Sequence, residues 1–133
     1  MQSISSIDIS SSGLAAERMR MEVIANNVAN ANTTMGPNGQ PFRRQEVVFK
    51  TAIEDSRSAG VSVVGVQADD SELPKIYKPG HPHADSKGFV TMPNVVVSNE
   101  MVDLMVASRA YEANLNAIKT YQEMANSTLE LLR

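Results

Sequence analysis

The sequence predicts a mainly α-helical protein with a small β region. Long N- and C-terminal helices are expected to pack as a coiled-coil-like hairpin, with short β-strands in the middle. Two observations lead to this fold class. Apolar residues recur at helical spacing near both ends of the 133-residue chain. Between these ends, β-branched residues are separated by Gly- and Pro-containing turns. We expect three segments, namely an N-terminal assembly helix (1–34), a β-containing middle (35–97) and a C-terminal assembly helix (98–133).

The N-terminal helix is predicted over residues 5–29. Ile7, Leu14, Met21 and Val28 repeat every seven residues, and Ile24 follows Met21 on the same side. Gly13 interrupts this pattern and costs up to about 1 kcal/mol relative to Ala. A glycine here permits either a close approach of another helix or a bend. After the helix, GPNG at residues 36–39 predicts a turn.

Four short strands are predicted in the middle of the chain. The segments 42–49, 61–66, 75–77 and 89–92 are rich in Val, Ile, Phe and Tyr. The valines of 61–66 point to both faces, which suggests a strand that is covered on both sides or used at an interface. The polar segment 54–60, rich in small residues, is expected to be a flexible loop.

The C-terminal helix is predicted as one continuous element over residues 101–133. Neither Gly nor Pro interrupts this stretch, and Ser98 or Asn99 can serve as its N-cap. At 1.5 Å per residue it would be about 50 Å long, well above the globular average. Two columns at heptad spacing run along it, one with Met101, Ser108, Leu115, Gln122 and Leu129, the other with Leu104, Tyr111, Ile118, Ala125 and Leu132.

Composition and charge exclude several classes of protein. The net charge of -3 provides no basic surface, so we expect no nucleic-acid binding. The absence of cysteine excludes disulfides, iron–sulfur clusters and thiolate zinc sites. No stretch approaches the roughly 18 apolar residues that span a bilayer, so direct membrane insertion is not expected. The N-terminus lacks a basic segment followed by an apolar run, so we expect no cleaved secretory signal.

Candidate metal and catalytic groups are weak. His81, His83 and Asp85 form an H-x-H-x-D pattern, but no third histidine completes an imidazole triad. Asp69, Asp70 and Glu72 lack the spacing of a calcium loop, and we expect both groups to be exposed loops. No serine lies in a G-x-S-x-G motif. We therefore expect no enzyme, no cofactor, no metal and no small-molecule substrate.

A cluster of asparagines marks the end of the first helix. Asn26, Asn27, Asn30 and Asn32 lie within seven residues, and Asn26 and Asn30 share a helical face. One interpretation is a frayed, capped helix end, which accounts for one or two of them. The other is a set of polar locks, because an Asn within a helix seam fixes register at some cost in stability.

At both ends, these residues resemble the bacterial flagellar rod and hook axial protein family. The N-terminal resemblance rests on SGLAA at 12–16 and ANNVANANT at 25–33, and the C-terminal one on EMVDL at 100–104 and ASRAYEAN at 107–114. The middle is similar to that of the proximal-rod members, through GQPFRRQEVVF at 39–49, YKPGHPHADSKGFV at 77–90 and MPNV at 92–95. The resemblance covers essentially the whole chain.

The resemblance implies a structural subunit of the proximal rod in the flagellar basal body. Such a subunit would polymerise through its terminal helices into the drive shaft that transmits torque from the rotor to the distal rod and hook. Its partners would be copies of itself, other proximal and distal rod proteins, the rotor-to-rod junction protein and the flagellar type III export apparatus. It would function in the periplasmic space after type III export, without enzymatic activity.

We expect the residues that matter most to lie at an assembly interface. Arg109 and Glu112 could form charged contacts between subunits, or could equally be a solvated helix face. Two other classes of function remain as alternatives: a soluble ligand-binding or enzymatic small domain with a self-contained helix/sheet core, and a helical adaptor that binds one partner. The predicted interface comprises Leu14, Met21, Ile24, Asn26, Asn27, Val28, Asn30, Met101, Leu104, Arg109, Tyr111, Glu112, Leu115 and Ile118.

Overall fold

Two long helices and two small antiparallel sheets make up the protein. The computed structural model describes residues 6–54 and 57–131. The predicted fold class is confirmed, with helices at both ends and strands between them. The elements in chain order are α1 (Ser6–Ala29), β1 (Gln45–Glu54), β2 (Arg57–Ala68), β3 (Lys75–Tyr77), β4 (Phe89–Thr91) and α2 (Val97–Leu131).

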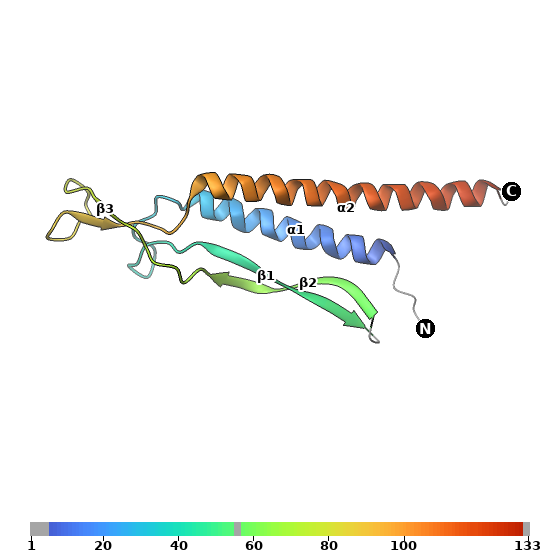
Figure 1. Ribbon diagram of the computed structural model, residues 1–133, viewed down its shortest axis with the longest axis horizontal. Coiled ribbons are helices and arrows are strands. Elements are labelled where there is room, and N and C mark those ends of the chain that lie inside the picture. The colour runs from blue at the N-terminus through green and yellow to red at the C-terminus, as the bar shows by residue number, and fades with distance from the viewer. Residues whose placement is uncertain (1–5, 55–56, 132–133) are drawn as a thin grey trace.

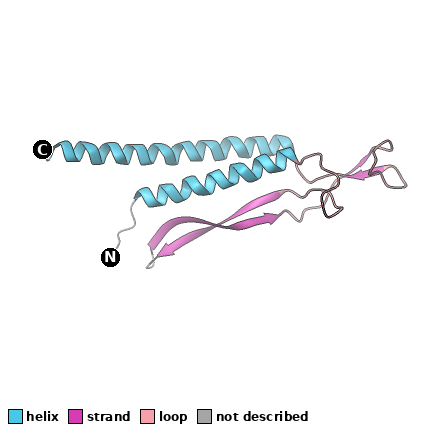
Figure 2. Ribbon diagram, turned by 180° about the vertical axis from the view of Figure 1, so that it is seen from behind, coloured by secondary structure: helices cyan, strands magenta, loops and turns pink. Residues whose placement is uncertain are grey.

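The elements are arranged in three layers, with α1 in the middle. The β1–β2 hairpin packs along α1, and α2 packs against α1 on the opposite side (Figures 1 and 2). With 24 and 35 residues, α1 and α2 are about 36 and 52 Å long. The C-terminal part of α2 therefore extends well beyond the described start of α1 (Figure 1).

The β1–β2 hairpin is longer than the sequence predicts. The strands predicted at 42–49 and 61–66 run instead over Gln45–Glu54 and Arg57–Ala68. The prediction of a flexible loop at 54–60 was therefore wrong, because residue 54 belongs to β1 and residues 57–60 belong to β2. Residues 55–56 lie outside the described residues. Cross-strand pairing and packing against α1 override the weak strand propensity of the small polar residues there. Register shifts at Val48/Phe49 and Ala52/Ile53 increase the twist of the hairpin.

The second sheet, formed by β3 and β4, lies beyond the end of the helix pair at which α1 ends and α2 begins (Figure 1). β3 pairs with β4, and the rings of Tyr77 and Phe89 meet edge to face at 5.3 Å. The strand predicted at 75–77 is confirmed, and the one at 89–92 ends one residue earlier. The predicted turn at 36–39 is also confirmed, since the amide of Gly39 donates to the carbonyl of Gly36 at 2.9 Å.

Helix α2 begins earlier than predicted. The carbonyl of Val96 accepts the amides of Asn99 and Glu100 at 3.0 and 3.1 Å, so the helix starts at Val97. The prediction that Ser98 or Asn99 caps the helix was therefore wrong, because both already lie within its first turn. At the other end, the predicted residues 132–133 lie outside the described part of the chain.

The two helices are antiparallel and approach closely at Gly13. A Cβ atom on Gly13 would lie 3.0 Å from Nδ2 of Asn114 on α2, so the glycine permits a close approach of the two helices. Further along, Asn27 of α1 contacts Glu100 of α2. Equal numbers of residues separate the two contacts on each helix, which indicates one constant register. The same register places Ser6 level with Tyr121, so α2 continues past the described start of α1.

The core is small for a chain of this size. The accessible surface is 9541 Å², whereas a compact monomer of 14.4 kDa exposes about 6,800 Å². Large apolar side chains are exposed on every layer, including Ile53, Val64 and Leu131 at 70%, 63% and 89%. Among the described residues, the buried apolar side chains are Ala16, Val23, Ile24, Ala31, Val90, Met92 and Ala107.

The loop before β4 depends on an ionised carboxylate. Asp85 accepts the amides of Lys87 and Phe89 at 2.8 and 2.9 Å. The amide of Phe89 contributes most to lowering the pKa of Asp85 below its ordinary value of 3.8. The contribution of this carboxylate to local order is complete above pH 3.8 and is lost as the pH falls through the lower folded-state pKa.

We therefore expect the amide resonances of Lys87 and Phe89 to shift in nuclear magnetic resonance spectra only below about pH 4, as Asp85 is protonated. In Asp85→Asn, which removes the titrating group, the same resonances should show no such transition. An unchanged low-pH transition in this variant would assign the effect to another group.

Candidate assembly interface

A stripe of exposed apolar residues runs along α2, and we call it the outer stripe. Its members are separated by four or seven residues, so they share one face of the helix. Val102, Val106, Met124 and Leu131 are 54%, 50%, 64% and 89% exposed. Neither α1 nor the hairpin covers this face, which is unusual for a chain that folds in isolation. The outer stripe comprises Val102, Val106, Ala113, Ala117, Met124 and Leu131.

Most of the predicted interface residues of α2 lie toward α1. Leu104, Tyr111, Leu115 and Ile118 are half-buried in the seam between the helices. Met101 is different, because its side chain is 58% exposed. Arg109 and Glu112 are exposed and form no ion pair with another described residue. A role for these seven residues between subunits stays a prediction.

The predicted seam residues of α1 differ in burial, because this helix packs against α2 on one side and against the β1–β2 hairpin on the other. Leu14 lines a groove with Tyr111 of α2, and Met21 and Val28 are half-buried. Ile24 is buried with only 4% exposed, beside Val23. Val23 and Ala16 lie outside the predicted heptad column and are also buried, with 8% and 4% exposed.

The asparagine cluster connects three elements. The buried amide of Asn27 donates to the carbonyl of Gln45 and accepts the amide of Gln45, both at 2.9 Å. Asn26 donates to the side chain of Gln45 at 3.2 Å. Asn30 donates to the carbonyl and side chain of Asn26 at 3.0 and 2.8 Å, which closes the end of the helix. The cluster therefore includes both a helix end and a lock on β1. Asn32 is exposed.

A buried carboxylate lies where the layers meet. Glu100 of α2 is fully buried, with 1% of its side chain exposed. Its Oε2 accepts Nδ2 of Asn27 at 2.9 Å, and its Oε1 accepts Nε of Arg44 at 2.5 Å. Arg44 also pairs with Glu46 and reaches Asp103 at 3.5 Å. We call this set, formed by Asn27, Arg44, Gln45 and Glu100, the polar junction.

Burial and pairing oppose each other at Arg44. Burial lowers the pKa of Arg44, but the hydrogen bonds and charges of Glu100 and Glu46 outweigh it and raise the pKa above its ordinary value. The guanidinium is therefore charged in every accessible condition. Near it, backbone and side-chain hydrogen bonds from Ser71 lower the pKa of Asp69, with a smaller contribution from Arg44. The junction thus contains a permanent cation surrounded by carboxylates.

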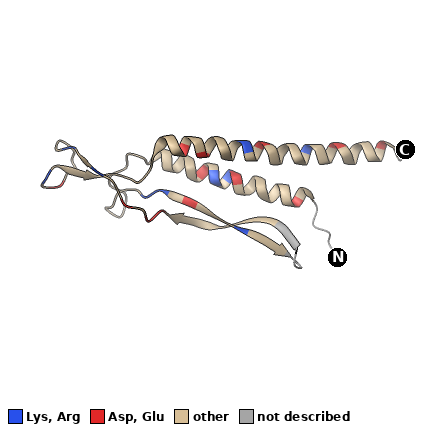
Figure 3. Cartoon of the chain, viewed as in Figure 1, with Lys and Arg blue, Asp and Glu red and all other residues tan. Residues whose placement is uncertain are grey.

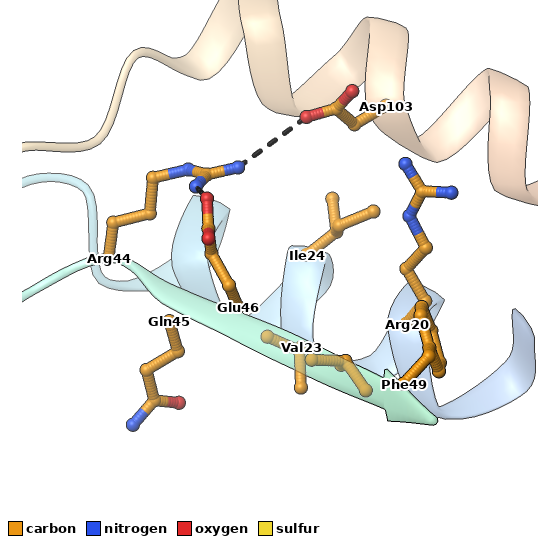
Figure 4. A pocket seen from close by; sticks show the side chains of 9 residues that line it. Arg20, Val23, Ile24, Arg44, Gln45, Glu46, Phe49 and Asp103 are labelled. Atoms are coloured by element: carbon orange, nitrogen blue, oxygen red, sulfur yellow. Dashed lines mark hydrogen bonds and ion pairs between the residues drawn. The ribbon is translucent and has the colours of Figure 1, made fainter. Parts of the chain in front are cut away.

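A groove of about 390 Å³ opens beside the polar junction, between α1, β1 and α2 (Figure 4). Val23, Ile24 and Phe49 form its apolar wall, and Arg20, Arg44 and Asp103 lie around it. No nucleophile and base are paired there. The groove therefore combines apolar and charged side chains.

The remaining sequence candidates do not form a chemical site. His83 bonds to Thr34 at 2.8 Å and its ring lies 5.3 Å from that of His81. Across the described residues no group of three His, Asp or Glu is placed to hold a metal ion. Residues of both signs are interspersed along both helices (Figure 3). None of the described helices is long and apolar enough to cross a bilayer.

Comparison with protein families matches both ends of the chain. A family model described as "Flagella basal body rod protein" matches residues 7–37, which contain most of α1. A second model, described as "Flagellar basal body rod FlgEFG protein C-terminal", matches residues 86–131, which contain β4 and α2. The two helices that pack together here are therefore of the kind found in flagellar rod proteins.

Individual relatives extend the similarity over the whole chain. A flagellar basal-body rod protein FlgC from Borreliella burgdorferi is 39% identical, with 97% of both chains covered. The FlgC protein of Salmonella typhimurium is 44% identical over 93% of both chains. That of Bacillus subtilis is 35% identical over 98% of this chain and 99% of the relative.

These similarities define a flagellar axial protein, and the chain is a structural subunit of the flagellar basal-body rod rather than an enzyme. At the level of the individual family, the chain belongs to the FlgC proteins. Its location is the flagellar basal body. The resemblance noted at residues 12–16, 25–33 and 100–114 is thereby confirmed, and the ligand-binding and adaptor alternatives have no support.

Sequence reasoning missed the two features that dominate the site. The outer stripe was detectable, because Val102, Val106, Met124 and Leu131 follow heptad-like spacing. The two heptad columns that the sequence analysis identified along residues 101–133 do not include these residues. Arg44 and Glu100 were not detectable as a pair. They lie 56 residues apart in the sequence. A glutamate in the first turn of a helix is usually exposed, and no local pattern indicates that Glu100 is buried.

Proposed function

We propose that this subunit polymerises into the proximal part of the rod through its terminal helices, with the outer stripe of α2 as a main contact with neighbouring subunits. The observation that carries the proposal is the exposure of an apolar face at heptad-like spacing along a helix of 35 residues. A polymer would bury this face, as coiled-coil helices do. Torque would then be shared by many parallel helix contacts.

The proposed partners are copies of this chain and other rod proteins, including the rotor-to-rod junction protein. Export through the flagellar type III apparatus into the periplasmic space is part of the same proposal. What supports it is the membership of the chain in a family of flagellar basal-body rod proteins. The absence of cysteine suits a chain that crosses from a reducing to an oxidising compartment.

The outer stripe is a better test of assembly than the seam. Leu104 is half-buried against α1, so a charge there would disturb the subunit itself. Met124 is 64% exposed on the part of α2 that extends past α1. We expect Met124→Glu to leave the helical circular dichroism unchanged and to reduce swimming by at least about tenfold, because burying an unpaired carboxylate at each contact costs more than 1.4 kcal/mol.

The matched control is Asn126→Glu, which adds the same charge two residues away, on the opposite side of α2 from the outer stripe. Swimming halos in soft agar and isolated basal bodies would be compared in cells whose own copy of the gene is replaced. Asn126→Glu should support normal rods. If Met124→Glu cells swam as well as Asn126→Glu cells at native expression, the outer stripe would not be part of the assembly surface.

A further inference from the structure

The apolar seam between α1 and α2 does not by itself define one register. Leu104, Ala107, Tyr111, Leu115 and Ile118 recur at similar spacing along α2. Sliding α2 by one heptad would place Tyr111 where Leu104 had been and Ile118 where Tyr111 had been, so these apolar positions tolerate the change. Small side chains such as Ala107 leave few distinctive shapes to interlock. The alignment must be selected by something less tolerant than apolar packing.

Glu100 is less tolerant, because its hydrogen bonds exist in one alignment only. Both carboxylate oxygens are used, one by Asn27 and one by Arg44, and the side chain is 1% exposed. A slide of one turn would bring Leu104 or Val97 beside Asn27 and leave the carboxylate without these donors. A buried carboxylate that loses its partners is strongly unfavourable.

The hairpin is tied to the same point. Asn27 exchanges two hydrogen bonds with the backbone of Gln45, the first residue of β1, much as a neighbouring strand would. A slip of β1 by one residue would break both bonds and turn each side chain to the opposite face. It would also move Arg44 away from Glu100 and Phe49 out of the groove that it lines.

We propose that the polar junction is the register-setting device of the subunit, with Glu100 as the positioning residue that selects one alignment of α1, α2 and the β1–β2 hairpin. Its main contribution is geometric specificity rather than stability, as for single buried polar groups in coiled coils. The proposal concerns the isolated chain, so it holds or fails independently of the rod contacts proposed above.

The chain contains no cysteine, so two labels can be placed without background. Spin labels at Lys50→Cys on β1 and Lys119→Cys on α2, both exposed positions, report the distance between hairpin and helix. Pulsed electron paramagnetic resonance should give one narrow distribution of the distance between the two labels in the otherwise unchanged chain. In Arg44→Met/Glu100→Leu we expect a second population or about a twofold broadening, with helical circular dichroism retained.

The control replaces an exposed ion pair, Arg18 with Glu22, whose side chains are 74% and 57% exposed. Arg18→Met/Glu22→Leu should keep the narrow distribution. Three results would overturn the proposal: a narrow and unshifted distribution in the junction variant, loss of its helical signal, or a broad distribution in the unchanged chain. The second would mean that the junction supplies stability, and the third that it holds no single geometry.

Discussion

Gly60→Ala should undock the β1–β2 hairpin from α1 and lower the free energy of unfolding by about 2–3 kcal/mol. Gly60 has a φ of 119°, in a region that L-residues rarely adopt. A Cβ atom there would lie 2.3 Å from Oγ of Ser12, well inside contact distance. The estimate combines about 1 kcal/mol or more of backbone strain with the loss of one hydrogen bond worth about 1 kcal/mol.

The lost hydrogen bond is the one that joins hairpin and helix. Oγ of Ser12 accepts the amide of Val61 at 3.0 Å and donates to the carbonyl of Ile9 at 2.7 Å. The serine cannot move away from a new methyl group without releasing Val61. This contact gives the SGLAA sequence of α1 two separate roles, since Ser12 holds the hairpin while Gly13 admits α2.

Urea denaturation and hydrogen exchange at the Val61 amide would measure this effect. The control is Gly65→Ala in the same strand, where no atom lies within 4 Å of the added Cβ. That variant should change stability by no more than about 0.5 kcal/mol. If both variants behaved alike, the docking of the hairpin tip on Ser12 would have no energetic significance.

Arg44→Met alone should be the most destabilising substitution, at about 3–5 kcal/mol, because it leaves the buried carboxylate of Glu100 without its cationic partner. The remaining carboxylates of Glu46, Asp69 and Asp103 would also lose their shared counter-charge. Adding Glu100→Leu should restore most of the stability, since a buried ion pair and an apolar pair of similar volume are often equally stable.

Urea denaturation of the single and double variants would test this prediction, with Arg18→Met as the comparison. The Arg18–Glu22 pair is largely exposed, so its loss should cost between about 0 and 1 kcal/mol. A cost of that size at Arg44 would show that solvent enters the polar junction and screens Glu100. A double variant as unstable as Arg44→Met would show that the junction contributes stability itself.

The sequence by itself determined the two helices, the turn at 36–39 and the family of the protein. Helices and turns are encoded by residues within a few positions of one another, so Ile7, Leu14, Met21 and Val28 predict α1 correctly. The family resemblance is also read from contiguous residues. The strands were located only approximately, because the pairing partner and the helix beneath them set their ends.

The tertiary structure decided how these pieces meet. Only the fold shows that α1 packs on two sides, that Glu100 is buried beside Asn27, 73 residues away, and that Leu104 faces α1 while Val102 and Val106 face outward. The physical reason is that burial depends on which elements come together, and a periodic helix has several faces of similar composition. Apolar spacing therefore predicts that a face will be covered, whereas long-range hydrogen bonds and close contacts determine which face is covered within the subunit.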